Sequence, residues 1–143
     1  MGETNGRTAA GGAASEGALR RLGELRRALL ALHKTLLDAE RAMYESMHGR
    51  VTGGELLQLV ISDAHFAWLR GVSELIVRID ELLAGVEPAT AEEADALLKG
   101  ARELLRPDEE GDEFGRRYFA ALQREPDAVL AHRRVTLVLA ADA

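Results

Sequence analysis

The chain contains no cysteine, few aromatic residues and no long apolar run. The lack of cysteine excludes disulfides, thiolate catalysis and cysteine metal ligands. Aromatic side chains make up 4% of the 143 residues, so Leu, Ala, Val and Ile must fill the core. This composition favours helices packed through aliphatic side chains over a β-sandwich. A chain of this length predicts one domain with a single core.

The same absences bear on location and partners. No apolar run approaches the roughly 20 residues that cross a bilayer, so we expect no membrane partner. The N-terminus lacks the apolar core of a signal peptide, and we therefore expect a cytoplasmic protein of a bacterium-like cell. The net charge is −6, which argues against nucleic acid as the main partner.

Charge is distributed unevenly along the chain. Residues 18–50 carry seven basic and four acidic side chains, whereas residues 80–113 carry three basic and twelve acidic side chains. Complementary surfaces of this kind can steer packing within a bundle or contacts between subunits. Two ordinary solvated faces are the alternative interpretation.

Residues 19–48 show the 3.5-residue period of a coiled-coil seam. The repeating apolar positions are Leu22, Leu25, Leu29, Leu32, Leu36, Ala39 and Met43. Together with Leu30, Leu37 and Tyr44 they cover an arc of roughly 160° of the helix surface. A seam this wide predicts contact with at least two neighbouring helices, or with one helix and a second subunit.

Cap signals and prolines predict the remaining elements. We expect helices over about 16–48, 53–61, 64–84, 91–105, 113–124 and 126–140, with a break at Ser62–Asp63. Residues 135–139 are β-branched enough for a strand, but an isolated strand would have no partner. The sequence predicts an all-α antiparallel bundle of four main helices with one or two short extra helices. Residues 1–17 are expected to form a flexible tail, and residues 18–143 a single helical-bundle domain.

Two polar residues, His33 and Glu40, lie inside the apolar arc of the first helix. Tyr44 follows Glu40 by four residues and could hydrogen-bond to it. If His33 and Glu40 are buried, each needs a partner from another helix. The candidate partners on the 64–84 helix are Arg70, Ser73, Arg78 and Asp80. Three interpretations stay open: a structural contact that fixes register, partial exposure, or a site that binds a ligand or handles protons.

His65 and Trp68 lie one turn apart at the start of the 64–84 helix. Trp68 continues the apolar stripe, which is typical of a core anchor, while an exposed ring could stack on a planar ligand. With His33, Glu40 and Tyr44, these two residues complete the candidate ligand-binding set.

Motifs for metal or covalent chemistry are incomplete. Glu45 and His48 form one Glu-x-x-His pair, whereas a diiron bundle needs two such pairs. Asp63 and His65 could contribute to a zinc site, but Asp63 already suits a helix cap. There is no P-loop, G-x-G-x-x-G or G-x-S-x-G. We therefore predict no catalytic residue, no metal site and no cofactor.

Three segments resemble an uncharacterised family of small bacterial helical-bundle proteins. They are Leu32–Arg41 (LHKTLLDAER), Ser73–Leu83 (SELIVRIDELL) and Gly111–His132 (GDEFGRRYFAALQREPDAVLAH). The resemblance implies a small cytoplasmic protein that works as one unit. It transfers no activity, cofactor or site residue.

The sequence predicts a non-enzymatic interaction protein that acts as a homodimer or binds a protein partner. The long first helix, its wide apolar arc and the charge asymmetry support this prediction. The alternative is a bundle that binds a small ligand or a metal, as a sensor or minor enzyme, through the polar column His33, Glu40 and Tyr44 with His65 and Trp68. That alternative predicts an internal cavity beside His33.

Overall fold

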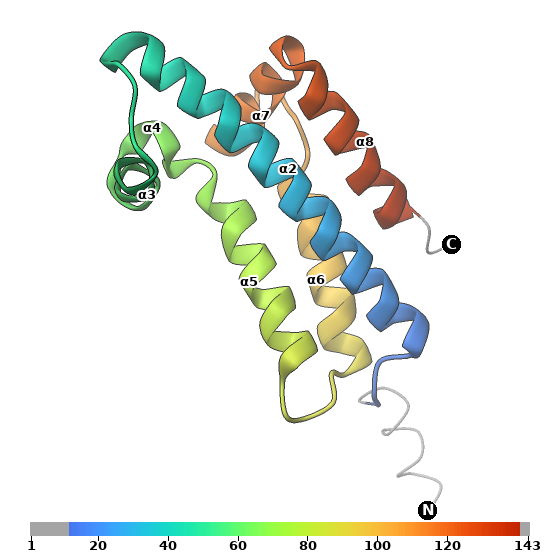
Figure 1. Ribbon diagram of the computed structural model, residues 1–143. Helices are drawn as coiled ribbons and strands as arrows, with labels where there is room; N and C mark the ends of the chain where they lie inside the picture. Colours follow the sequence, from blue (N-terminus) through green and yellow to red (C-terminus); the bar gives the residue numbers. More distant parts are fainter. Residues whose placement is uncertain (1–11, 141–143) are drawn as a thin grey trace, which may run out of the picture.

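The computed structural model describes residues 12–140, and the regular elements in this range are all α-helices (Figure 1). They are α2 (Glu16–His48), α3 (Gly53–Ser62), α4 (Ala64–Ala67), α5 (Arg70–Ala84), α6 (Ala91–Leu104), α7 (Glu113–Arg124) and α8 (Pro126–Ala140). The predicted all-α class is confirmed. Within the same range, no helix combines the length and the apolar character that crossing a membrane requires.

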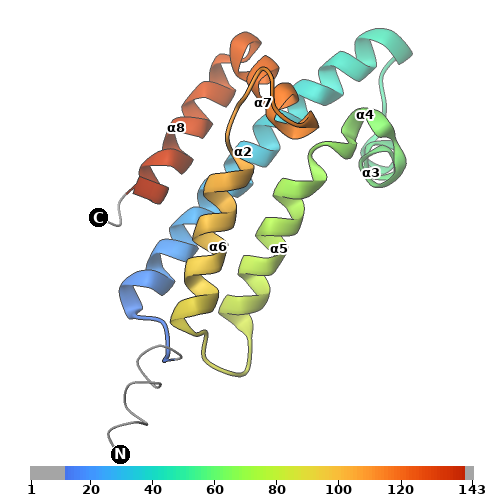
Figure 2. The same ribbon diagram turned by 180° about the vertical axis from the view of Figure 1, so that it is seen from behind.

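The long helix α2 is the centre of the arrangement. It packs against α4, α5, α6 and α8, which agrees with the wide apolar arc predicted for it. In Figures 1 and 2, the successive long helices α2, α5, α6 and α8 run in alternating directions, and α7 lies across one end. Helix α3 stands apart from these helices and contacts mainly α4.

The core consists mostly of aliphatic side chains. Leu22, Leu25, Leu29, Leu32 and Leu36 of α2 are at most 1% exposed. The other helices supply the remaining core residues, which include Val72, Ile79, Ala94, Leu98, Ala101, Tyr118, Ala128 and Val135. The seam of α2 nevertheless ends earlier than its period predicts, because Met43 is 37% exposed.

Local signals explain most of the helix ends. Thr52 and Thr90 each close the expected capping box at the start of α3 and α6. Gly49 ends α2 with a φ of 90°, a backbone conformation that is strained for any residue with a side chain. The break at Asp63 is also present, and this side chain caps α4 by accepting a hydrogen bond from the His65 N–H.

The predicted 64–84 helix is interrupted at Trp68 and Leu69, and this prediction of a continuous helix is wrong. In an unbroken helix, Phe66 and Trp68 would point about 200° apart, to opposite faces. Here both side chains are buried, at 1% and 6% exposure. The interruption between α4 and α5 lets both rings enter the protein interior, and no glycine or proline marks it in the sequence.

The packed region also begins earlier than predicted. The Ala14 N–H donates to the Ala89 carbonyl, and the Ala91 N–H donates to the Gly12 carbonyl. This short antiparallel contact ties the segment before α2 to the start of α6. Residues 12–17, predicted as tail, therefore belong to the folded region. The rest of the predicted tail, residues 1–11, lies outside the described residues.

Truncating the seam should destabilise the protein far more than truncating an exposed leucine. Leu29 is fully buried, whereas Leu130 is 65% exposed. We expect Leu29→Ala to lower the free energy of unfolding by about 2–5 kcal/mol, because it leaves a cavity in the core. The matched Leu130→Ala change should stay within about 0.5 kcal/mol of the parent protein. Urea unfolding followed by circular dichroism measures both values, and equal losses would contradict the described core.

Candidate functional site

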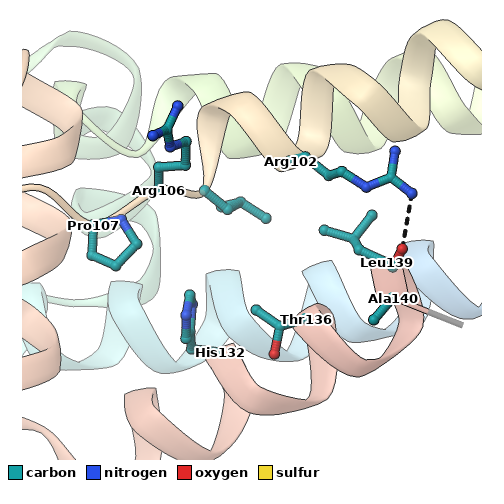
Figure 3. Close-up of a pocket in the computed structure, with 8 residues that line it drawn as sticks. Arg102, Arg106, Pro107, His132, Thr136, Leu139 and Ala140 are labelled. Atoms are coloured by element: carbon teal, nitrogen blue, oxygen red, sulfur yellow. Dashed lines mark hydrogen bonds between the residues drawn. The ribbon is translucent and has the colours of Figure 1, made fainter.

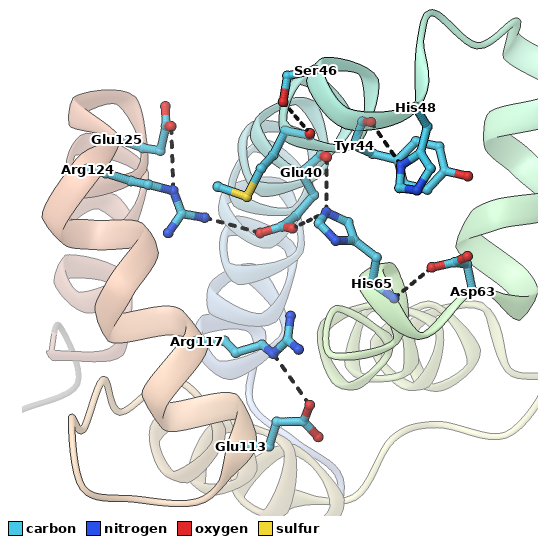
Figure 4. A network of polar contacts seen from close by, with 11 residues as sticks. Glu40, Tyr44, Ser46, His48, Asp63, His65, Glu113, Arg117, Arg124 and Glu125 are labelled. Carbon is cyan, nitrogen blue, oxygen red and sulfur yellow. Dashed lines mark hydrogen bonds and ion pairs between the residues drawn. The ribbon is translucent and has the colours of Figure 1, made fainter.

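A buried carboxylate, Glu40, joins three helices (Figure 4). Its side chain is only 5% exposed. His65 Nε2 lies 2.8 Å from Glu40 Oε1, and Arg124 Nη2 lies 3.3 Å from Glu40 Oε2. Each carboxylate oxygen therefore has one partner, which offsets part of the cost of placing a charge away from water.

Each member of this cluster comes from a different helix. Glu40 lies on α2, in the apolar arc that packs on the rest of the protein. His65 sits in the single turn of α4, whose start is fixed by the Asp63 cap. Arg124 is the last residue of α7. The cluster thus fastens both α4 and α7 to the same turn of α2.

His65 connects α4 to α2 through its contacts with Glu40. A carboxylate only accepts hydrogen bonds, so Nε2 of His65 must carry the proton that faces Glu40. The same nitrogen also lies 3.3 Å from the Glu40 backbone carbonyl. Among residues 12–140, no hydroxyl group is bonded to this ring. The arrangement orients an imidazole and holds α4 in place, without a nucleophile beside it.

Tyr44 packs next to the cluster without joining it by a hydrogen bond. Its ring stacks on His48 with centroids 4.2 Å apart, and it meets His65 edge-on at 5.8 Å. In the described part of the chain, no bond links the Tyr44 hydroxyl to Glu40, in contrast to the bond that the sequence suggested. The ring of Tyr44 thus packs against His65 and His48 without binding Glu40.

His33 lies apart from Glu40 and pairs with another helix. Its Nε2 lies 2.9 Å from Ser73 Oγ on α5, and Ser73 was one of the predicted partners. A surface hollow of about 370 Å³ adjoins this pair, lined by Ser73, Glu74, Val77 and Arg78. Because its lining comes from one helix, it is an open depression, whereas ligand cavities take their walls from several elements.

Trp68 is also separate from the Glu40 cluster. The side chain is 6% exposed and packs on Phe114 of α7, with ring centroids 5.4 Å apart. Its Nε1 is buried and has no hydrogen-bond partner among residues 12–140. These contacts are those of a core anchor between α4 and α7.

The predicted set thus falls into three places. Glu40, His65 and Tyr44 lie together, while His33 and Trp68 are elsewhere. Arg124 completes the cluster, and the sequence does not predict it. A basic residue in the last turn of a helix is common and indicates no partner. No group of three or more potential metal-ligating side chains occurs in the described part of the chain. The pairs Glu45 with His48 and Asp63 with His65 therefore belong to no such group.

Helix α3 is an apolar helix that buries none of its residues. Leu57 and Ile61 are both 59% exposed. They lie four positions apart and therefore on the same face of the helix. Only one of the ten residues of α3, Glu55, is charged. Leu57 and Ile61 thus form an exposed apolar face, and apolar residues grouped on a surface can mark contact sites.

Polar contacts fix both ends of α3 although its side chains contribute little packing. Before the helix, the Arg41 guanidinium donates to the Val51 carbonyl at 2.8 Å, and the Val51 N–H donates to the Glu45 carboxylate at 2.9 Å. The Val51 N–H and the nearby Arg41 hold the pKa of Glu45 below its usual value. In the last turn of the helix, the Ile61 carbonyl accepts a hydrogen bond from Arg70 at 3.1 Å.

The Glu40 cluster should behave as one energetic unit. We expect a double-mutant cycle of Glu40→Gln and His65→Gln to give a coupling energy of about 1–2 kcal/mol, because the two side chains make a direct and largely buried polar contact. The control cycle pairs Glu40→Gln with His33→Gln, whose side chain bonds Ser73 instead. There the coupling should stay below about 0.5 kcal/mol. Chemical unfolding of the six proteins measures both cycles, and equal coupling would refute a specific pair.

Stability should fall in mild acid partly because of His33. Burial lowers the pKa of His33 from its usual value of 6.5. As the pH drops below 6.5, the unfolded chain therefore takes up this proton first, and acid favours unfolding. Between pH 6.5 and the lowered pKa, the free energy of unfolding should decrease, and it should decrease less in His33→Gln. Urea titrations above and below pH 6.5 test this expectation, and identical pH profiles for both proteins would contradict it.

Comparison with models of protein families gives no match for this chain. Comparisons with curated proteins and with solved structures give no significant match either. Function must therefore be argued from the described residues themselves.

Proposed function

We propose that the protein is a non-enzymatic interaction protein that forms a homodimer through the exposed face of α3. The observation that carries this proposal is an apolar helix that buries no residue and is yet fixed at both ends by polar contacts. A helix that contributes little to its own core needs another reason to be held in one place. Presentation of Leu57 and Ile61 to a partner supplies that reason.

The Glu40 cluster supports the proposal because it holds α4, the helix that directly follows α3, on α2. Helix α4 follows α3 after a single residue, Asp63. The His65–Glu40 contact fixes α4 on α2, and the Arg41–Val51 contact fixes the other end of α3. A preorganised surface binds with a smaller loss of conformational entropy than a loose one.

A second copy of the chain is the partner that the charge pattern favours. Residues 41–70, which include α3 and both of its flanks, carry three basic and three acidic side chains. The whole chain has a net charge of −6. Two copies that meet through their acidic surfaces would repel each other, whereas a neutral segment can face itself across a two-fold axis. Leu57 and Ile61 would form the apolar centre and the balanced charges the polar rim.

The setting is part of the same proposal. We place the protein in the cytoplasm of a bacterial cell, on the basis of its lack of cysteine and the resemblance of three segments to a bacterial family. Neither nucleic acid nor a membrane is included among the proposed partners.

The dimer should depend on the outer face of α3. An association free energy of about −5.5 kcal/mol corresponds to a dissociation constant of about 100 µM. At about this protein concentration, we expect the parent protein to sediment as a dimer. The double change Leu57→Glu and Ile61→Glu should give a monomer, because it buries two charges in the proposed contact. Analytical ultracentrifugation and native mass spectrometry measure the mass.

The matched control changes the same residue types elsewhere. Leu130 and Leu137 of α8 are 65% and 58% exposed. Their replacement by Glu adds the same charge and removes a similar apolar area, and it should leave the dimer intact. A parent protein that is monomeric at this concentration would end the dimer proposal. A dimer lost only in the α8 variant would move the interface to α8.

A further inference from the structure

A groove separate from α3 and from the Glu40 cluster lies between the end of α6 and α8 (Figure 3). It has a volume of about 440 Å³. One wall consists of Arg102, Leu105, Arg106 and Pro107, and the other of His132, Thr136, Leu139 and Ala140. Its size falls in the range of small-molecule sites, and its walls come from separate elements.

The charge of this groove is opposite to that of the chain. Two of its eight lining residues are arginines, and none carries a carboxylate. The chain as a whole has 24 acidic and 18 basic side chains. Most of the lining is otherwise apolar, through Leu105, Pro107 and Leu139. The surface therefore suits a molecule that combines a negative group with an apolar body.

Both arginines of the groove have side-chain N–H groups that are available to bind a ligand. Arg102 donates one hydrogen bond to the Leu139 carbonyl at 2.8 Å, which leaves other N–H groups of its guanidinium unused. No hydrogen bond or ion pair joins the Arg106 side chain to another residue within 12–140. Guanidinium groups match a carboxylate with two parallel donors.

His132 adds a neutral N–H donor, and the buried Tyr118 hydroxyl fixes the orientation of its ring. The hydroxyl of Tyr118, a fully buried residue, lies 2.7 Å from His132 Nδ1. Burial raises the pKa of Tyr118 and lowers the pKa of His132, so the phenol keeps its proton and the imidazole is neutral at pH 7. The phenol then donates to Nδ1, and the single ring proton is on Nε2. Tyr118 is thus a positioning residue that turns the groove side of His132 into a donor.

We propose that the groove between α6 and α8 binds a small organic anion, an apolar molecule with one carboxylate. The exposed Arg106 pairs with the carboxylate and His132 Nε2 donates to it, Arg102 adds positive charge at the other end of the groove, and the apolar body lies against Leu105 and Leu139. This site is independent of the dimer proposed for α3.

The test uses 2-naphthoate as the probe and 2-naphthamide as its neutral counterpart of the same shape. We expect saturable chemical-shift changes in ¹⁵N spectra that are confined to the end of α6 and to α8, and binding of the amide should be about tenfold weaker. Equal affinity for acid and amide would overturn the anion site. Shift changes centred on other helices, or none at millimolar probe, would do the same.

Variants then separate the groove from general charge attraction. Arg106→Gln should weaken 2-naphthoate binding about tenfold, because a charge-assisted bond is lost. Arg134→Gln removes the same charge from α8 outside the groove lining and should leave the affinity unchanged. Equal weakening in both variants would show attraction by net charge alone and would contradict the proposal.

The role of Tyr118 has its own readout. Long-range ¹⁵N spectra of the imidazole report which ring nitrogen carries the proton. The parent protein should show the Nε2–H form, and Tyr118→Phe should show a mixture of both forms together with weaker 2-naphthoate binding. An unchanged ring form, or unchanged affinity in that variant, would remove Tyr118 and His132 from the site.

Discussion

The placement of the elements around the end of α2 depends on one constraint, a carboxylate inside an apolar arc. Glu40 lies on the face of α2 that meets the other helices, where water is scarce. Its charge is tolerated because His65 and Arg124 each reach one oxygen. The two partners belong to α4 and α7, so neither helix can move away from α2 without leaving a buried charge unpaired. A group that is costly by itself thereby specifies how three helices meet.

Helix α3 is connected to this constraint through α4, which follows it after one residue. Its outer residues gain nothing from the core, and its place depends on polar contacts before and after it. Two kinds of contact thus have different roles in this protein. The aliphatic seam of α2 stabilises the core, and the polar contacts near the end of α2 orient α3. Leu57 and Ile61 thus face outwards from a helix whose two ends are held by hydrogen bonds.

The sequence predicts the elements well because their signals are local. Capping boxes at Thr52 and Thr90, the glycine after α2 and the proline at the start of α8 each act within a few residues. The interruption at Trp68 follows instead from the burial of two rings on different sides. Likewise, the partners of Glu40 lie 25 and 84 residues away along the chain, beyond any local period. Ser73 was predictable as a partner of His33 because the helices that carry them were already expected to pack.

The backbone contact between residues 12–14 and 89–91 has a consequence for how the protein opens. The first turn of a helix ordinarily frays by itself, at almost no cost. Here the strand-like segment before α2 is hydrogen-bonded to the residues that cap α6. Fraying at one of these helix starts must break bonds at the other, so the two form one cooperative unit of local unfolding. A fluctuation that would be confined to the first turn of α2 is converted into a joint and less frequent motion of two helices.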